Sequence, residues 1–252
     1  RFNRQSEAIA SQAGQQSDAD EARWMALQGP ASPALTAYIR DHARHYDAFF
    51  FYTYSYATTA DNICLVGDRA ILVPLAHEEW IINFRLFDRV FAAARGFIFQ
   101  TPEERALLRE RFRQLPLAGP IAATGIVPPT AVDTQAFRRR FDLQRPFALY
   151  VGRVDVAKGC DLLIDYYLGL LADAPDPSRL PDLVLVGGSV MEIPVHPRIR
   201  ALGFIDAADR DAAIAACEFL INPSAHESLS LVLLEAWSLA RPVLVNGRCA
   251  VL

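Results

Sequence analysis

The second half of the chain alternates short, wholly apolar runs with longer stretches of helical spacing. The apolar runs at residues 147–151, 183–186 and 219–221 are each followed, after a loop, by a stretch that favours a helix or the next strand. A strand that is apolar on both faces must be buried on both faces, as in a parallel sheet covered by helices. The alternation therefore predicts an α/β fold on a parallel sheet. The elements expected here are strands at 147–151, 183–186, 219–221 and 242–245, and helices at 160–172, 207–217 and 231–240.

The first half shows the same alternation less regularly. Thr101, Pro102 and Glu104 form the capping pattern of a helix start, with a proline in the first turn. We expect a second parallel sheet here, also covered by helices. Its expected strands lie at 46–52, 70–75, 96–99 and 122–127, and its expected helices at 34–44, 80–94 and 103–112.

A polar segment separates the two halves. Pro128 and Pro129 are followed by residues 131–146, which we interpret as a linker between a first domain at 1–130 and a second domain at 147–252. The chain begins with Arg1 rather than Met, and its last expected strand lies close to its end. We therefore expect a piece of a longer polypeptide, with the second domain lacking its end.

Composition excludes several classes of protein. The net charge of −4 argues against a nucleic-acid surface, and no run of eighteen apolar residues is present to form a transmembrane segment. The four cysteines have no metal-binding spacing, which favours reduced thiols and a cytoplasmic location. Neither the dinucleotide-binding nor the P-loop glycine motif occurs, so support for those two enzyme classes is lost.

Two carboxylates, Glu227 and Glu235, stand eight positions apart where a polar loop runs into the expected helix at 231–240. Eight helical positions span about 12 Å, enough to hold both ends of an extended ligand. Carboxylates accept hydrogen bonds from hydroxyl groups, and a helix start binds phosphate. The alternative for Glu227 is a purely structural role, in which its charge interacts with the dipole of the helix. Glu235 sits in a helix that is apolar on nearly every side, so we expect it to be buried and paired.

This stretch resembles the E-x7-E signature of group 1 (family 4) retaining glycosyltransferases. Glu227 and Glu235 are the two acids, followed by Ala236, Trp237 and the sequence Arg-Pro-Val at 241–243, while Ser228 and Ser230 replace the usual glycines. The resemblance implies the GT-B fold: two Rossmann-like, doubly wound parallel-sheet domains that face each other across a cleft, both incomplete in this chain.

Two further segments match positions that bind the donor in this family. Gly152 and Arg153 end the expected strand at 147–151, and Lys158 follows five residues after Arg153. By residue chemistry alone, Lys158 is better explained as a surface lysine. The resemblance implies that these residues contact the donor diphosphate, and that backbone groups at Phe204 or Ile205 read the nucleobase. The alternative for Phe204 and Ile205 is an ordinary buried strand and turn.

In the first half, His77 follows the expected strand at 70–75 and precedes Glu78 and Glu79. Its imidazole suits proton transfer near neutral pH. The alternative is a histidine at a helix start with two capping acids. The resemblance implies that His77 contacts the hydroxyls of the transferred sugar, or the acceptor.

The expected function is therefore a retaining glycosyltransferase of the hexosyltransferase type, with a nucleotide-sugar donor, an unidentified acceptor (a glycan, a lipid or a small molecule), no cofactor and no metal site. Two alternatives stay open: a non-catalytic nucleotide-sugar-binding module, and another GT-B reaction such as sugar-nucleotide epimerisation or hydrolysis. The candidate catalytic residues are His77, Arg153, Lys158 and Glu227, and the candidate donor-binding residues are Gly152, Arg153, Lys158, Phe204, Ile205, Glu227, Ser228, Leu229, Ser230, Leu231 and Glu235.

Overall fold

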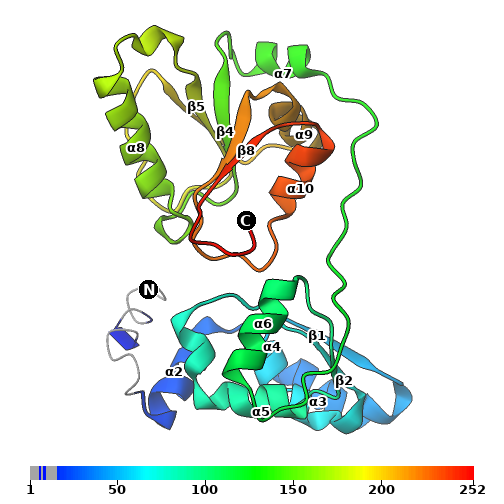
Figure 1. Ribbon diagram of the computed structural model, residues 1–252. Coiled ribbons are helices and arrows are strands. Elements are labelled where there is room, and N and C mark those ends of the chain that lie inside the picture. Colours follow the sequence, from blue (N-terminus) through cyan, green and yellow to red (C-terminus); the bar gives the residue numbers. More distant parts are fainter. Residues whose placement is uncertain (1–5, 7, 10–15) are drawn as a thin grey trace. The chain divides into compact units, whose positions relative to one another are not determined.

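The computed structural model describes residues 6, 8–9 and 16–252 and divides the chain into two compact units, residues 1–123 and 124–252. Each unit is an α/β structure on its own parallel sheet (Figure 1). The units are described separately below.

The first unit has a three-stranded parallel sheet in the order β1-β2-β3. Strands β1 (Phe49–Tyr52), β2 (Ala70–Val73) and β3 (Gly96–Phe97) are shorter than the apolar runs that predict them. The helices are α2 (Asp18–Gln28), α3 (Pro33–His42), α4 (Ala57–Ala60), α5 (Arg85–Ala93) and α6 (Pro102–Arg111), with single 3-10 turns at Ala43–His45, Ile63–Leu65, Gly67–Arg69 and Trp80–Asn83.

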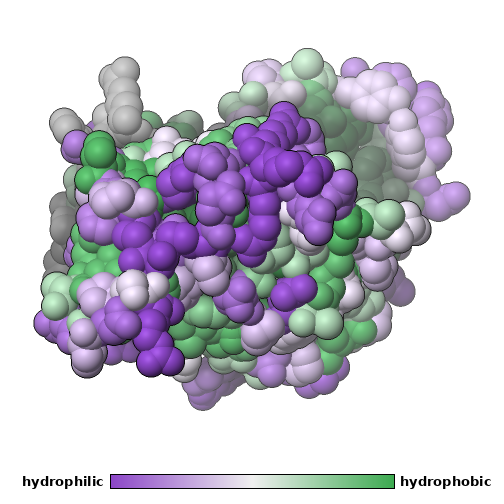
Figure 2. Space-filling view, turned by 90° about the horizontal axis from the view of Figure 1, so that it is seen from above, coloured by the Kyte–Doolittle hydropathy of each residue, from purple (hydrophilic) through white to green (hydrophobic). Residues whose placement is uncertain are grey.

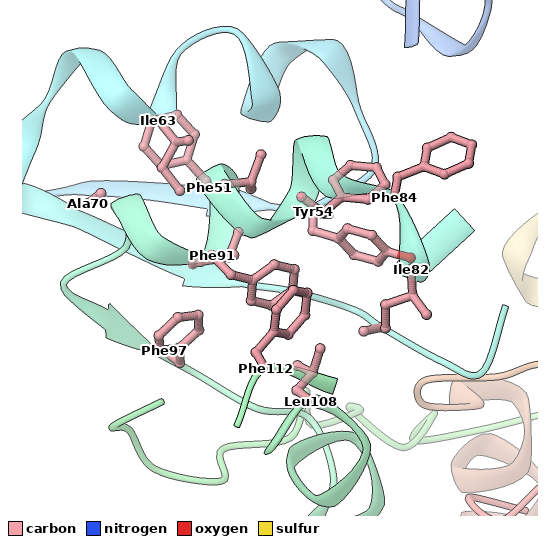
Figure 3. Close-up of a cluster of buried hydrophobic side chains, with 14 of the residues drawn as sticks. Phe51, Tyr54, Ile63, Ala70, Ile82, Phe84, Phe91, Phe97, Leu108 and Phe112 are labelled. Carbon is pink, nitrogen blue, oxygen red and sulfur yellow. The ribbon is translucent and has the colours of Figure 1, made fainter. Parts of the chain in front are cut away.

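Aromatic side chains fill the core of this unit (Figure 3). The rings of Phe91 and Phe112 stack with centroids 4.1 Å apart, and Tyr54 meets Phe87 edge-on at 4.7 Å. Such pairs add roughly 0.5–1.5 kcal/mol each beyond the area they bury.

Two predictions for this unit are wrong. The helix expected at 80–94 is interrupted at Phe84, because the carboxylate of Glu21 accepts the backbone N–H groups of Arg85 and Leu86 and so starts α5 there. The strand expected at 122–127 does not form. Only an isolated bridge joins Phe99 to Ile121, and the residues that follow are mostly exposed, so their apolar side chains gain no burial from pairing.

The second unit has a five-stranded parallel sheet in the order β6-β5-β4-β7-β8. Its strands are β4 (Phe147–Val151), β5 (Asp182–Val186), β6 (Ile199–Gly203), β7 (Phe219–Asn222) and β8 (Val243–Val245), and its helices are α7 (Thr134–Arg140), α8 (Cys160–Asp173), α9 (Ala207–Ala216) and α10 (Leu231–Ser238), with 3-10 turns at Val156–Lys158 and Pro177–Arg179.

Helices cover both faces of this sheet, which explains why β4 and β5 are apolar throughout. Phe147 and Leu149 of β4 belong to the core shared with α7, α9 and α10, whereas Tyr150 belongs to the core shared with α8. Figure 1 shows α8 on one side of the strands and α9 and α10 on the other. The apolar runs thus predicted a two-sided sheet correctly.

The segment interpreted as a linker, residues 131–146, contains helix α7. Asp133 caps it through a 2.8 Å hydrogen bond from the N–H of Ala136, and Phe137 is only 1% exposed. The side chain of Arg138 donates to the carbonyl oxygens of Leu143, Arg145 and Ala216. The many charged residues of this stretch indicate a linker, although the buried aromatic side chain of Phe137 packs it against the sheet.

The helix that carries Glu235 is less buried than its composition predicts. Leu231 and Trp237 of α10 are exposed, and only Leu233 and Ala236 are fully buried. A helix on the outside of a sheet buries one stripe, and Val232 of α10 packs partly buried beside that stripe.

The surface mixes polar and apolar side chains. Figure 2 shows one face of the molecule, on which hydrophilic residues gather toward the viewer with hydrophobic residues beside them. In the part of the chain that the structure describes, no helix has the length and apolar character needed to cross a membrane.

Replacing Phe137 with Ala should destabilise the second unit, because the side chain packs between Phe141 and Phe147 with centroid distances of 4.9 and 6.4 Å. Removing a buried phenylalanine costs about 3–5 kcal/mol. Hydrogen exchange of a peptide covering β4 should therefore become at least about a hundredfold faster. The control is Tyr166→Ala, which removes an exposed ring and should leave β4 protected. Equal exchange in both variants would contradict the assignment of α7 to this core.

Candidate functional site

The loops that follow β4 and β7 meet at one edge of the second sheet. These two strands are neighbours in the sheet. From β4 the chain continues to β5 and β6 on one side, and from β7 it continues to β8 on the other side. In a parallel sheet, such a switch of direction opens a crevice at the carboxyl ends of the strands, where ligands bind. The sequence-predicted residues Gly152, Arg153 and Lys158 follow β4, and Glu227 follows β7.

Glycines allow the strand ends to come close together. A Cβ on Gly187 would lie 2.0 Å from the carbonyl oxygen of Gly152, and a Cβ on Gly159 would lie 2.8 Å from that of Pro223. Gly159 also has a φ of +73°, which other residues rarely adopt. The loop after β4 is therefore in contact with the loops after both neighbouring strands.

Lys158 and Glu227 form an ion pair across this edge, with Nζ 2.8 Å from Oε1. Side-chain exposure is 34% for Lys158 and 16% for Glu227, so the pair is partly shielded from water. The structure thus joins two of the predicted catalytic residues directly. The resemblance implies that Lys158 contacts the donor diphosphate, and it gives no contact between Lys158 and Glu227.

Buried polar side chains hold the loop that carries Glu227. The amide of Asn222 donates to Ser230 Oγ at 3.0 Å, and its oxygen accepts the N–H of Ser224 at 3.1 Å. Ser224, which is fully buried, donates from Oγ to the carbonyl of His226. The hydroxyl of Ser230 is thus hydrogen-bonded to Asn222, and it does not cap α10. The N–H of Leu233 donates to the carbonyl oxygen of Ser230, and the start of α10 has no side-chain cap, an arrangement that suits an anion.

Arg153 is paired with a neighbour on its own loop. Its Nε lies 2.8 Å from Oδ2 of Asp155, and the other carboxylate oxygen of Asp155 caps the following turn by accepting the N–H of Ala157. The Arg153 side chain nevertheless stays 60% exposed. Tyr150 donates its hydroxyl to the carbonyl of Arg153 at 2.8 Å, and burial raises the pKa of this tyrosine, which keeps it a donor.

A cavity of about 550 Å³ opens beside Gly152 and Arg153. Residues from the ends of β4, β5 and β6 and from the start of α9 form its wall, among them Phe204, Ile205 and Arg210. Phe204 is 89% exposed, so the alternative of an ordinary buried strand is wrong for this residue. Strand β6 ends at Gly203, whose φ of +69° turns the chain outward.

Glu235 lies on α10 and is paired with Arg210 of α9, with Oε1 3.2 Å from Nη2. Burial raises the pKa of Glu235, the charge of Arg210 lowers it, and Asp211 raises it again. The expectation that this acid is paired is met by an arginine that the sequence analysis did not single out.

In the first unit, His77 lies on the loop after β2. Its Nε2 is 3.9 Å from Oε1 of Glu79, which also accepts the hydroxyl of the buried Tyr54 at 2.7 Å. Residues 74–79 are irregular, and the 3-10 turn Trp80–Asn83 begins directly after them. Glu79 precedes this turn but makes no side-chain capping hydrogen bond, so the alternative of a helix-capping arrangement is wrong for Glu79.

Glu104 anchors that loop. Thr101 accepts the N–H of Glu104 as the capping pattern predicts, but the carboxylate of Glu104 accepts the N–H groups of Ala76 and Gln100. It is only 2% exposed and thus ties the loops after β2 and β3 together. The capping pattern predicts only a local role for Glu104 at a helix start. It does not indicate that the carboxylate also connects the two loops.

Among the described residues, no group of three histidine, cysteine or acidic side chains is arranged to hold a metal ion. The pair His42 and His45 lies on the surface of α3 and the turn after it, with ring centroids 5.9 Å apart.

Comparisons with known proteins find similar sequences and folds. Residues 145–250 match the family model of Glycosyl transferases group 1. The chain is 29% identical over 136 residues to an alpha-D-kanosaminyltransferase of Streptomyces kanamyceticus, a match that covers 46% of this chain and 33% of that protein. The chain thus corresponds to about a third of the length of this curated relative.

Two solved structures show the fold. Sucrose-phosphate synthase from Thermosynechococcus elongatus superposes with a TM-score of 0.63 at 18% identity, over 94% of this chain and 64% of that one. A pneumococcal O-GlcNAc transferase, GtfA, solved with UDP and GlcNAc, gives 0.57 at 14% identity, over 83% and 44%. The structural neighbours are GT-B proteins, which confirms the predicted fold class.

Glu104 should make the stability of the first unit depend on pH. Burial raises the pKa of its carboxyl against the opposing effect of backbone hydrogen bonds, so the folded state binds a proton more readily than the unfolded chain. This contribution is present below the ordinary glutamate pKa and is lost as pH rises through the raised one. Relative to Glu104→Gln, the parent unit should lose stability over that window.

Urea unfolding at several pH values measures the difference. A Trp237→Phe background restricts tryptophan fluorescence to Trp24 and Trp80, which both lie in the first unit. Identical pH slopes for the parent chain and the Glu104→Gln variant would show that the carboxyl titrates normally.

Proposed function

We propose, from the match of residues 145–250 to the family model of Glycosyl transferases group 1, that the protein transfers a sugar from a nucleoside-diphosphate donor to an acceptor hydroxyl. The observation that carries the proposal is the Lys158–Glu227 ion pair at the switch point of the second sheet. It brings a cation suited to phosphate and an acceptor suited to sugar hydroxyls to one place.

The diphosphate binds next to Gly152, where the missing side chain lets the backbone approach. Arg153 offers a planar fork that is 60% exposed, and Lys158 offers a point charge. Backbone N–H groups from Ser228 to Leu231 add a helix N-terminus that lacks a side-chain cap. These donors neutralise the negative charge that develops on the departing diphosphate.

The remaining parts of the donor occupy the surroundings of this anion site. Glu227 accepts hydrogen bonds from the transferred sugar, and Glu235 accepts them from the ribose. The nucleobase enters the 550 Å³ cavity, where backbone groups of Phe204 and Ile205 read its edge. His77, in the first unit, contacts the sugar hydroxyls or the acceptor.

The transfer retains the anomeric configuration, as we propose from the family resemblance. The bond from the anomeric carbon to the diphosphate breaks, the acceptor oxygen bonds to that carbon on the same face, and the leaving diphosphate takes the acceptor proton. We propose that this step needs no divalent metal, because Arg153 and Lys158 supply the compensating charge. The four free cysteines fit a reducing compartment such as the cytoplasm.

Donor binding tests the proposal first. Calorimetric titration with UDP and GDP should give saturable binding; UDP is included because the structural relative GtfA was solved with it. No binding at millimolar concentrations of either nucleotide would end the proposal. Incubation with UDP-sugars, an acceptor alcohol and a chelator should then yield a glycoside with the donor's anomeric configuration.

The products separate the alternatives. Donor consumed without acceptor indicates hydrolysis, and conversion to a second nucleotide sugar indicates epimerisation. Binding without any consumption indicates a non-catalytic module.

Arg153→Ala should lower kcat/KM at least about tenfold, because the leaving diphosphate loses a charge-assisted contact that strengthens in the transition state. Arg179→Ala is the matched control, since Arg179 is an exposed arginine on a turn of the same unit. His77→Ala provides a contrast: turnover should fall while UDP affinity is unchanged, because His77 belongs to the other unit. A fall of less than twofold for Arg153→Ala would remove that residue from the mechanism.

A further inference from the structure

Arg210 occupies a position between the nucleotide cavity and Glu235. It lines the cavity from the start of α9, together with Arg153 and Phe204. Its Nη2 lies 3.2 Å from Oε1 of Glu235 and 3.0 Å from Oδ1 of Asp211, and its Nε lies 3.3 Å from the same Asp211 oxygen. One guanidinium thus joins an acid on its own helix to an acid on α10.

This contact limits how the Glu235 carboxylate can be oriented. A glutamate side chain has several rotamers of similar energy, and ordering it has an entropic cost. Arg210 presents a rigid, planar fork that Asp211 also holds, so Glu235 is bound to a fixed partner. Because Oε1 is used by Arg210, the direction of the second oxygen, Oε2, is largely determined as well.

The charge of Arg210 also favours the ionised form of Glu235, which can only accept hydrogen bonds. Glu235 is partly buried, which favours the protonated form, and the guanidinium opposes that effect. A neutral carboxyl would place a proton where a ligand hydroxyl needs to donate its own.

We propose that Arg210 is a positioning residue that aims the Glu235 carboxylate at the ribose of a nucleoside diphosphate and so selects ribose over 2′-deoxyribose. The inference rests on the proposed function, because it requires that the cavity takes a nucleotide. Arg210 acts through Glu235 and does not touch the reacting atoms.

A direct contact between Arg210 and the diphosphate would have a different consequence. Positioning through Glu235 affects only the hydrogen bond from the 2′-hydroxyl of the ribose. The affinity for a nucleotide without that hydroxyl should therefore be unchanged when Arg210 is replaced. A phosphate contact would be lost equally for both nucleotides. Comparing the affinities for UDP and 2′-deoxy-UDP therefore distinguishes positioning through Glu235 from a direct phosphate contact.

The test measures the affinities of UDP and 2′-deoxy-UDP for the whole chain by calorimetry. A hydrogen bond from a hydroxyl to a charged acceptor predicts that the parent chain binds UDP about tenfold or more tightly than 2′-deoxy-UDP. Arg210→Gln should weaken UDP binding by a similar factor, leave 2′-deoxy-UDP binding within about twofold, and so remove the preference.

Further variants tie the effect to the pair. Glu235→Gln should remove the same preference, and adding Arg210→Gln to it should change little, because contacting residues are not additive. Arg210→Lys should restore part of the preference, since an ammonium can still pair with Glu235. The matched control is Arg179→Gln, which should leave both affinities unchanged.

Three results would overturn the inference. Equal losses of UDP and 2′-deoxy-UDP binding in Arg210→Gln would assign Arg210 to the phosphates or to folding. Additive effects of Arg210→Gln and Glu235→Gln would show that the two residues act separately. UDP binding by the parent chain without any preference over 2′-deoxy-UDP would reject selection of ribose while leaving donor binding intact, whereas no nucleotide binding at all would reject the proposed function and this inference together.

Discussion

The close approach of the loops after β4 and β7 is the constraint on which the candidate site depends. Gly159 leaves no room for a side chain beside the carbonyl of Pro223, and this contact brings Lys158 within 2.8 Å of Glu227. The buried hydrogen bonds of Asn222 and Ser224 hold the second loop in place.

The charged groups of this site are paired before any ligand arrives. Arg153 lies against Asp155, Lys158 against Glu227, and Arg210 against Glu235. Each cation is thereby held at a defined point near the strand ends. A bound diphosphate would replace the anionic partners of Arg153 and Lys158 only, so the cost of reorganising the site is small.

Local patterns predicted most of the fold. The five apolar residues of β4 match the observed strand, and the parallel sheet with helices on both faces follows from the alternation of strand and helix signals. The errors concern residues whose structure depends on distant partners. The charged residues around Phe137 indicate a linker, but the buried side chain of Phe137 orders this segment as a helix. Glu21 lies on α2, far away in the sequence, and its carboxylate fixes the start of α5 at Arg85.

The amino-acid sequence by itself determined most of the strands and helices, the glycines at the strand ends and the two acids eight positions apart, because these depend on backbone preferences and on spacing along one element. Only the tertiary structure decided which charges meet. Lys158 and Glu227 are 69 residues apart, and Arg210 joins Glu235 from another helix. Ion pairs depend on distance in space, and no periodicity in the sequence encodes that distance.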